Sequence, residues 1–255
     1  MAIGNPAPGE ELWVAHLGQV PYGDAVALQE RVRARRQAGE IPDALLLLEH
    51  PPVYTKGRRS EATELPMGED WYLMQGIEVA ETDRGGRVTY HGPGQLVGYP
   101  IMAVTDVLAY VRTMERALIA ALGDERIDAE VRDGLTGVWA RERKIGSIGV
   151  HVSRGVTTHG FAINVDNDLQ PFEWIVPCGI EGVRMTSVYL ETRSRSLPCF
   201  RRHAAWRFAE ALGRRQRLVS LERLTGEPGI RAPSPALGPP HAAAREQWRP
   251  SHAEH

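Results

Sequence analysis

Residues 144–165 read KIGSIGVHVSRGVTTHGFAINV, and this stretch decides the fold class. Two runs rich in β-branched residues, Lys144 to Val152 and Thr157 to Val165, flank the turn pair Arg154-Gly155, which predicts a β-hairpin. Just upstream, Ile127 to Arg132 and Leu135 to Ala140 repeat the pattern around Asp133-Gly134. Successive hairpins of this kind predict an antiparallel sheet.

Helices are predicted on both sides of these hairpins. The first spans Asp24, its expected N-cap, to Gly39, and the strongest begins after Thr105, its expected N-cap, and ends at Gly123. A third is expected from Pro198 to Gly213. Shorter strand candidates complete the set: Glu11–Gly18, Asp43–Glu49, Ile77–Ala80, Arg87–Tyr90 and Leu96–Met102. This order predicts an α+β fold whose mixed, mostly antiparallel sheet carries packed helices.

Two stretches lack a periodic pattern. Residues 50–70 are expected to form a long irregular segment, because proline and glycine recur in them. Residues 226–255 are rich in proline and alanine, which is typical of a disordered tail. The sequence therefore predicts one catalytic domain over residues 1–225, followed by the tail 226–255.

Composition excludes several classes of protein. The chain has 255 residues, a formal net charge of −2 and two cysteines. The near-neutral charge argues against a nucleic-acid binder, and no apolar run is long enough to span a membrane. No secretory signal is recognisable at the start, and two cysteines form neither a disulfide framework nor a four-ligand zinc site. A reduced, cytoplasmic protein is the expectation.

Lysine is rare in this chain. Of the 30 basic residues only Lys56 and Lys144 are lysines, and the others are arginine. Where charge alone matters, such a chain is expected to use arginine. A retained lysine therefore indicates a role that arginine cannot fill, such as losing a proton near neutral pH.

The densest candidate segment is residues 83–96, which hold four glycines, a proline and His91. It could be a plain turn between strands, but its glycines would also let a ligand approach the backbone closely. It matches neither a phosphate-binding loop, which ends in Lys-Ser/Thr, nor the dinucleotide fingerprint, which opens a helix.

Cys178 is the candidate nucleophile, because it lies between Pro177 and Gly179 in an irregular segment. A thiol needs a nearby cation to become a thiolate at neutral pH. The candidate cations are Lys144, His91, His151 and His159. Cys199 begins an amphipathic helix and is expected to be structural and unreactive in the folded chain. No spacing of His and Cys indicates a metal site.

Three segments together resemble the octanoyltransferases, also called lipoyl(octanoyl) transferases. Residues 84–100 (RGGRVTYHGPGQLVGYP) carry the first motif, residues 137–165 the second and residues 177–188 the third. The similarity extends over roughly residues 12–215. Arg87 stands where that family often has Gln or Lys, and Gly146 where Ala is common.

The resemblance implies a fold similar to the catalytic domain of biotin and lipoate protein ligases. It also implies transfer of an octanoyl group from acyl carrier protein to a lysine of a lipoyl domain, through a thioester on Cys178 with Lys144 as its partner. The acceptors would be the lipoyl domains of 2-oxoacid dehydrogenase complexes and the glycine cleavage H protein. No cofactor and no metal are implied. The implied substrate contacts are Arg84, Gly85, Gly86, Arg87, Val88, Thr89, Tyr90, His91, Ser147, Ile148, Gly149, Gly160, Phe161 and Ala162.

Three alternatives remain open at this stage. An ATP-dependent lipoate or biotin protein ligase would share the fold, but it needs no nucleophilic cysteine. A cysteine hydrolase would pair Cys178 with His159 or His91 and use water as the acceptor. A non-catalytic module that binds lipoyl domains would have an unreactive Cys178.

Overall fold

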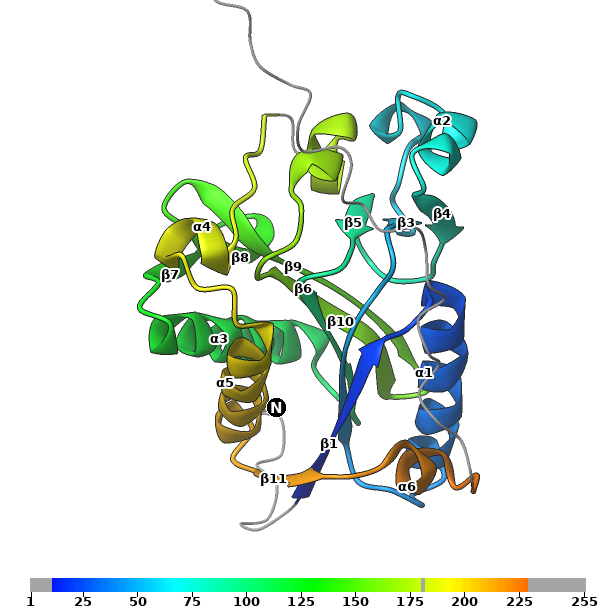
Figure 1. Ribbon diagram of the computed structural model, residues 1–255. Helices are drawn as coiled ribbons and strands as arrows, with labels where there is room; N and C mark the ends of the chain where they lie inside the picture. The colour runs from blue at the N-terminus through cyan, green and yellow to red at the C-terminus, as the bar shows by residue number, and fades with distance from the viewer. Residues whose placement is uncertain (1–10, 180–181, 229–255) are drawn as a thin grey trace, which may run out of the picture.

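The structure is a computed structural model that describes residues 11–179 and 182–228, apart from the side chain of Cys178 (Figure 1). Within these residues the main sheet has eight strands. In spatial order they are β11 (Arg215–Leu218), β1 (Glu11–Gln19), β2 (Ala44–Glu49), β6 (Gln95–Ile101), β10 (Val156–Asn164), β9 (Arg143–Ser153), β8 (Leu135–Ala140) and β7 (Ala129–Arg132). Only β1 makes parallel pairs, with β11 and β2, and the other neighbours are antiparallel. The predicted fold class is confirmed.

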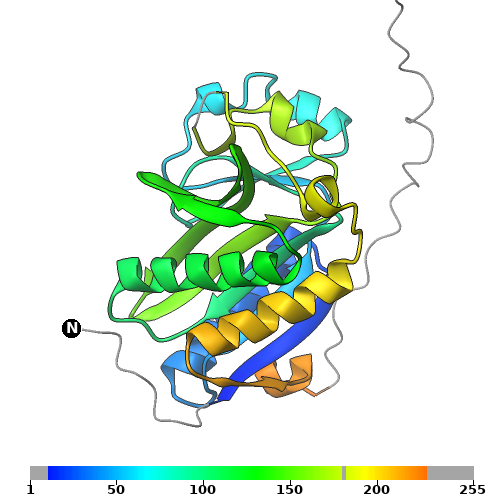
Figure 2. The same cartoon turned by 90° about the vertical axis from the view of Figure 1, so that its left-hand side faces the viewer.

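Helices cover both faces of this sheet. On one face lie α3 (Val107–Asp124) and α5 (Leu197–Ala211), which run side by side (Figure 2). On the other face lie α1 (Tyr22–Gln37) and the short α6 (Leu221–Thr225). The short α4 (Val188–Thr192) leads into α5.

Strand β2 shows why the core has two halves. Its leucines alternate between the faces, as residues of a pleated strand must. Leu45 and Leu47 pack in the cluster that includes α3 and α5, whereas Leu46 and Leu48 pack in the cluster that includes α1 and α6. All four are buried. A central strand that is covered on both faces has a continuous apolar sequence, and β2 has one in Leu45 to Leu48.

A second, three-stranded sheet lies at one end of the molecule, in the order β4 (Glu78–Glu81), β3 (Val53–Lys56), β5 (Thr89–His91) (Figure 1). It packs with α2 (Glu69–Met74) and the 3-10 turn η2 (Gln170–Trp174) around a core of its own. The expectation that residues 50–70 are irregular is therefore wrong in part. Strand β3 was missed because its four residues are too short to show a period.

The helix starts differ from the expected ones by a few residues. The N-cap of α3 is Asp106 rather than Thr105, because the Asp106 carboxylate accepts a hydrogen bond from the Ala109 backbone N–H at 3.0 Å. Helix α1 begins after Pro21, so Asp24 lies in its first turn instead of capping it. There its charge still favours the helix N-terminus.

The C-terminal part of the described chain holds two elements that were not expected, β11 and α6. Strand β11 is exposed along its whole length and carries two arginines, so it has no apolar alternation to reveal it. Gly226 ends α6 with φ +74°, and Glu227 forms an ion pair with Arg31 of α1 at 3.4 Å. The first residues of the predicted tail thus contact the domain, and residues 229–255 lie outside the described residues.

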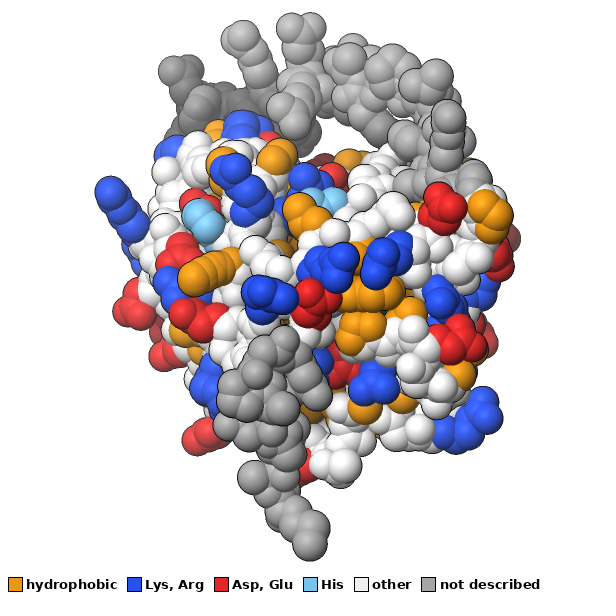
Figure 3. Space-filling view, turned by 90° about the horizontal axis from the view of Figure 1, so that it is seen from below, with side chains coloured by type: hydrophobic (Ala, Val, Ile, Leu, Met, Phe, Trp, Pro, Cys, Tyr) orange, Lys and Arg blue, Asp and Glu red, His pale blue; other side chains and the backbone are white. Residues whose placement is uncertain are grey.

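The space-filling view shows how charge is distributed on one face of the molecule (Figure 3). Figure 3 shows the face opposite the small sheet, where basic, acidic and hydrophobic side chains are interspersed. Among the described helices, none is long and apolar enough to cross a membrane.

Candidate active site

A cavity of about 640 Å³ opens between the main sheet, the start of α3 and the segment before β5. All but two of the residues predicted to contact substrate line it. The exceptions are Val88 and Tyr90, whose side chains belong to the core of the small sheet instead. Side chains alternate between the two faces of an extended segment, so Arg87, Thr89 and His91 point toward the cavity when Val88 and Tyr90 point away from it.

Strand pairing brings two of the predicted segments together. In the β9–β10 hairpin, Ile148 lies opposite Phe161 and Gly149 lies opposite Gly160. The segment from the first motif joins them, because the Gly85 N–H donates to the Val150 carbonyl at 2.9 Å. A Cβ atom on Gly149 would lie 2.8 Å from the Gly85 carbonyl oxygen, so this close approach requires glycine.

Lys144 lies at the start of β9 and lines the same cavity, although its side chain is among the most buried in the protein. Its backbone is held on both sides, since Lys144 N–H donates to the Arg184 carbonyl at 2.8 Å and Thr186 N–H donates to the Lys144 carbonyl at 2.9 Å. The ammonium lies 5.7 Å from the ring centroid of Trp139, which is within the range of a cation–π interaction.

The turn η3 (Pro177–Gly179) places the Cys178 backbone beside the cavity, because Gly179 is one of the lining residues. The structure therefore places Lys144 and the turn that carries Cys178 at one cavity. The side chain of Cys178 is not among the described ones. A contact between thiol and ammonium stays a prediction.

Glu64 is a site residue that the sequence did not indicate. Its buried carboxylate accepts from the Arg87 guanidinium at 2.6 Å and from the Val88 N–H at 3.2 Å. Its carbonyl accepts from the Val176 N–H at 3.0 Å, and the Arg87 side chain packs against Gly179. Arg87 and Glu64 thus hold the turn around residue 178 against the first motif. No local pattern could have revealed this, since these residues meet only in the folded chain.

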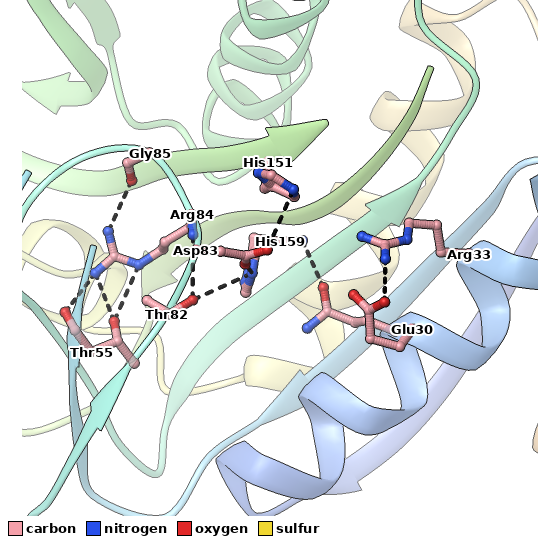
Figure 4. A network of polar contacts seen from close by, with 10 residues as sticks. Glu30, Arg33, Thr55, Thr82, Asp83, Arg84, Gly85, His151 and His159 are labelled. Carbon is pink, nitrogen blue, oxygen red and sulfur yellow. Dashed lines mark hydrogen bonds and ion pairs between the residues drawn. The ribbon is translucent and has the colours of Figure 1, made fainter. Parts of the chain in front are cut away.

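Arg84 also holds the first motif in place. Its guanidinium is mostly buried and donates to the carbonyl oxygens of Thr55 at 2.6 Å and Arg87 at 2.9 Å. The bond to Thr55 ties the first motif to β3 (Figure 4). A guanidinium suits this position because its fork of donors reaches several acceptors at once.

Asp83 was expected to be a turn residue, but it meets two of the candidate histidines. Its carboxylate lies 2.7 Å from His159 Nε2 and 3.4 Å from His151 Nε2 (Figure 4). Burial lowers the pKa of His159, and the bond to Asp83 opposes this only in part. His159 also adopts φ +57°, and its N–H donates to the Gln29 side chain at 2.6 Å.

His91 does not supply a cation. Its pKa is well below the usual value because the ring is fully buried and lies near His50. The ring nitrogen Nδ1 lies 2.6 Å from the Gln95 side-chain oxygen and donates to it. Near neutral pH His91 is therefore uncharged. His91 and His159 are also buried on the cavity wall, but Lys144 is the candidate cation whose backbone pairs with residues 184–186.

The helix predicted after Thr105 begins at the edge of the site. Its residues Val107, Leu108 and Val111 line the cavity, and Val107 and Leu108 are exposed. Cys199 lies in α5 and was expected to be structural and unreactive in the folded chain, which stays a prediction. It is half-buried, and hydrogen bonds with Ser196 and Arg202 lower the pKa of its thiol.

The described side chains include no cluster of three or more His, Cys, Asp or Glu residues placed to hold a metal ion.

The fold and the site define a class of protein. Residues 21–205 match the family model described as the lipoyl protein ligase A/B catalytic domain, and the chain belongs to this family. Within it, the chain groups with transferase enzymes, because many curated relatives are named octanoyltransferase. The relative from Solibacter usitatus is 53% identical over 168 residues, which are 64% of this chain and 76% of that protein. The relative from Koribacter versatilis is 44% identical over 211 residues, which are 77% of this chain and 84% of that protein.

Solved structures of more distant proteins share the fold. Lipoate-protein ligase A bound with ATP aligns with a TM-score of 0.63 at 20% identity, covering 86% of this chain and 93% of that one. The bipartite lipoate protein ligase of Thermoplasma acidophilum gives 0.64 at 19% identity, covering 86% and 90%. At these identities the likeness shows the fold alone.

Proposed function

We propose that this enzyme transfers an octanoyl group from acyl carrier protein to a lysine of a lipoyl domain, through a thioester on Cys178. The observation that carries the proposal is the meeting of Lys144 and the Pro177–Gly179 turn at one partly apolar cavity. Octanoyltransferase relatives support acyl transfer in lipoylation as the reaction.

The cavity suits the acyl chain. Apolar side chains from β9, β10 and α3 line it, among them Ile148, Phe161 and Leu108. Burying a methylene group stabilises a complex by about 0.8 kcal/mol, so six of them contribute about 5 kcal/mol.

The first half-reaction begins with the Cys178 thiolate, whose formation the Lys144 ammonium favours. The sulfur attacks the carbonyl carbon of the donor thioester, and the bond from that carbon to the donor sulfur breaks. The donor thiolate then takes up a proton and leaves as a thiol. Lys144 in its ammonium form can deliver that proton.

The second half-reaction needs a base. The amine nitrogen of the acceptor lysine attacks the Cys178 thioester, the carbon–nitrogen bond forms, and the carbon–sulfur bond breaks to return the thiolate. The amine must lose a proton in this step. Lys144 in its neutral form can take it, whereas an arginine in that position would stay protonated.

The test uses the intact protein, octanoyl-acyl carrier protein and no ATP. We expect one octanoyl mass to appear on Cys178 and to move to the lysine of a lipoyl domain when that domain is added. Cys178→Ala should form no adduct, and Cys199→Ala should form it normally. Transfer that requires free octanoate and ATP would identify a ligase instead, and an adduct that only water removes would identify a hydrolase.

A further inference from the structure

A second hollow adjoins the candidate active site. This arginine groove, of about 670 Å³, is lined by Arg132, Leu135, Trp139, Arg141, Glu142, Arg143, Gly182, Val183 and Arg184. It holds four arginines against a single carboxylate in its lining. Leu135 also lines the cavity described above, so it lies between the two hollows.

The groove reaches the immediate neighbourhood of Lys144. Arg143 directly precedes Lys144 on β9, so the two side chains point to opposite faces of the strand. The Arg184 carbonyl accepts the hydrogen bond from the Lys144 N–H. The groove thus lies beside the Lys144 backbone, and a ligand that leaves the cavity past Leu135 would reach it.

The structure holds several of these arginines in place before any ligand binds. The Arg132 guanidinium lies 4.7 Å from the Trp139 ring centroid and donates to the Arg141 carbonyl at 2.6 Å. Arg143 is held by Glu191 at 2.8 Å, and Arg141 lies 3.9 Å from the same carboxylate. Arg184 is exposed and has no ion-pair partner within residues 11–179 and 182–228.

Carboxylates near the groove neutralise part of this charge. Glu142 lines it, Glu191 pairs with Arg141 and Arg143, and Glu130 lies 3.5 Å from the Arg132 guanidinium. Four arginines against these three carboxylates leave about one net positive charge, which favours a ligand with one negative charge. Guanidinium groups bind phosphate oxygens with two parallel hydrogen bonds, so a phosphate ester suits the groove.

We propose that the arginine groove binds the phosphodiester of the phosphopantetheine arm that carries the donor acyl group. This inference rests on the proposed function, in which the acyl chain fills the cavity and the thioester lies between Cys178 and Lys144. The rest of the arm then has to leave the cavity. The groove offers it an exit at Leu135, with Arg184 and Arg141 at the positions that meet the phosphate.

Two small donors test the assignment, octanoyl-pantetheine and octanoyl-4′-phosphopantetheine, which differ only in the phosphate. The rate of octanoyl addition to Cys178 is followed by intact mass at donor concentrations below saturation. We expect the phosphorylated donor to react at least tenfold faster with the wild type, which corresponds to about 1.4 kcal/mol. Arg184→Gln, alone and combined with Arg141→Gln, should reduce this ratio toward one.

Arg116→Gln is the matched control, because Arg116 is an exposed residue of α3 that lines neither hollow and donates a hydrogen bond to the Thr113 hydroxyl at 2.9 Å. It should keep the wild-type ratio. Equal rates with both donors in the wild type would overturn the groove assignment and leave the proposed function intact. Failure of both donors and of octanoyl-acyl carrier protein to acylate Cys178 would overturn both. Arginine variants that slow only the whole carrier protein would show that the groove contacts protein, which would also overturn the assignment.

Discussion

Lys144 is a buried cation on which the proposed reaction depends. It is 2% exposed, and a Cβ atom on Gly137 would lie 2.8 Å from its Cε atom, so the space around it is tight. A buried ammonium is costly to desolvate, yet the fold keeps a lysine here in a chain that otherwise relies on arginine. Retaining a lysine rather than an arginine here fits the proposed reaction, in which this side chain delivers and takes up a proton.

Two substitutions separate the charge of Lys144 from its proton transfer. Lys144→Arg keeps the charge but cannot act as a base, and Lys144→Met has a similar length without the charge. Both should lower octanoyl transfer at least 100-fold, because general acid–base catalysis contributes about 10²–10⁴-fold. Lys144→Met should unfold at a temperature close to that of the wild type, since it replaces a buried cation by an apolar chain. Transfer by Lys144→Arg within tenfold of the wild-type rate would show that charge alone suffices.

His50 makes the stability of the fold dependent on pH. Burial lowers its pKa to about 4, and its ring lies between the Val20 carbonyl and the Tyr99 hydroxyl, each at 2.7 Å. The unfolded chain therefore binds a proton near pH 6.5 that the folded chain takes up only near pH 4. Stability that is present above pH 6.5 is lost as the pH falls through this range.

The pH dependence can be measured by urea denaturation at pH 7.5 and pH 5. His50 alone should account for a loss of about 2 kcal/mol between these values, from its two pKa values. His50→Gln should be less stable than the wild type at pH 7.5 but should lose about 2 kcal/mol less on acidification. The same loss in both proteins would mean that His50 titrates normally in the folded state.

At the residue scale, the sequence predicted the lining of the cavity better than its supports. Arg84, Lys144 and the hairpin glycines could be named because they lie in ordered motifs. Glu64 and Asp83 could not, since each acts through partners that are distant in sequence. A single carboxylate in a loop gives no signal of its own.

At the scale of elements, the hairpins and the three long helices were predictable because each has its own local period, turn pair or terminal signal. The elements that were missed are short and depend on a partner. Strand β3 exists because β4 and β5 pair with it, and β11 because β1 does. Element order was sufficient for the fold class, but it did not reveal the small sheet that closes one side of the cavity.

The pairing of β6 with β10 depends on a glycine. Gly98 lies opposite Phe161, and a Cβ atom there would collide with the phenyl ring. That ring also packs near Phe208 of α5, with 6.1 Å between ring centroids, so it has little freedom to move. Gly98→Ala should destabilise the protein by about 1–3 kcal/mol, as overpacked cores do. Urea denaturation measures the change.

Gly23→Ala is the matched control for this prediction. Gly23 lies in α1, and a Cβ atom there would meet nothing within 4 Å. Alanine should therefore raise stability by about 0.5 kcal/mol through its lower backbone entropy in the unfolded chain. Equal effects of the two substitutions would show that the contact with Phe161 is not what requires glycine at position 98.

At the scale of the whole molecule, the site lies where the two sheets meet, so its geometry depends on how the layers are joined. Asp43 joins several of them. It is 1% exposed, and its carboxylate pairs with Arg36 of α1 and with Arg214, which follows α5. It also accepts from the Ala103 N–H at 3.0 Å, just after β6. One side chain thus connects helices from both faces of the main sheet.

Removing this carboxylate should weaken the whole fold. Asp43→Ala leaves Arg214 mostly buried without the Asp43 carboxylate, and breaking a buried ion pair from one side costs about 3–5 kcal/mol. In a domain of this size that corresponds to a fall in the unfolding temperature of roughly 10 °C. Asp124→Ala is the control, because it removes a partly exposed pair with Arg207 and should cost less than about 1 kcal/mol. Differential scanning calorimetry compares the two. A similar small effect of both substitutions would mean that Asp43 does not join the layers energetically, and that apolar packing alone holds α1 and α5 on the sheet.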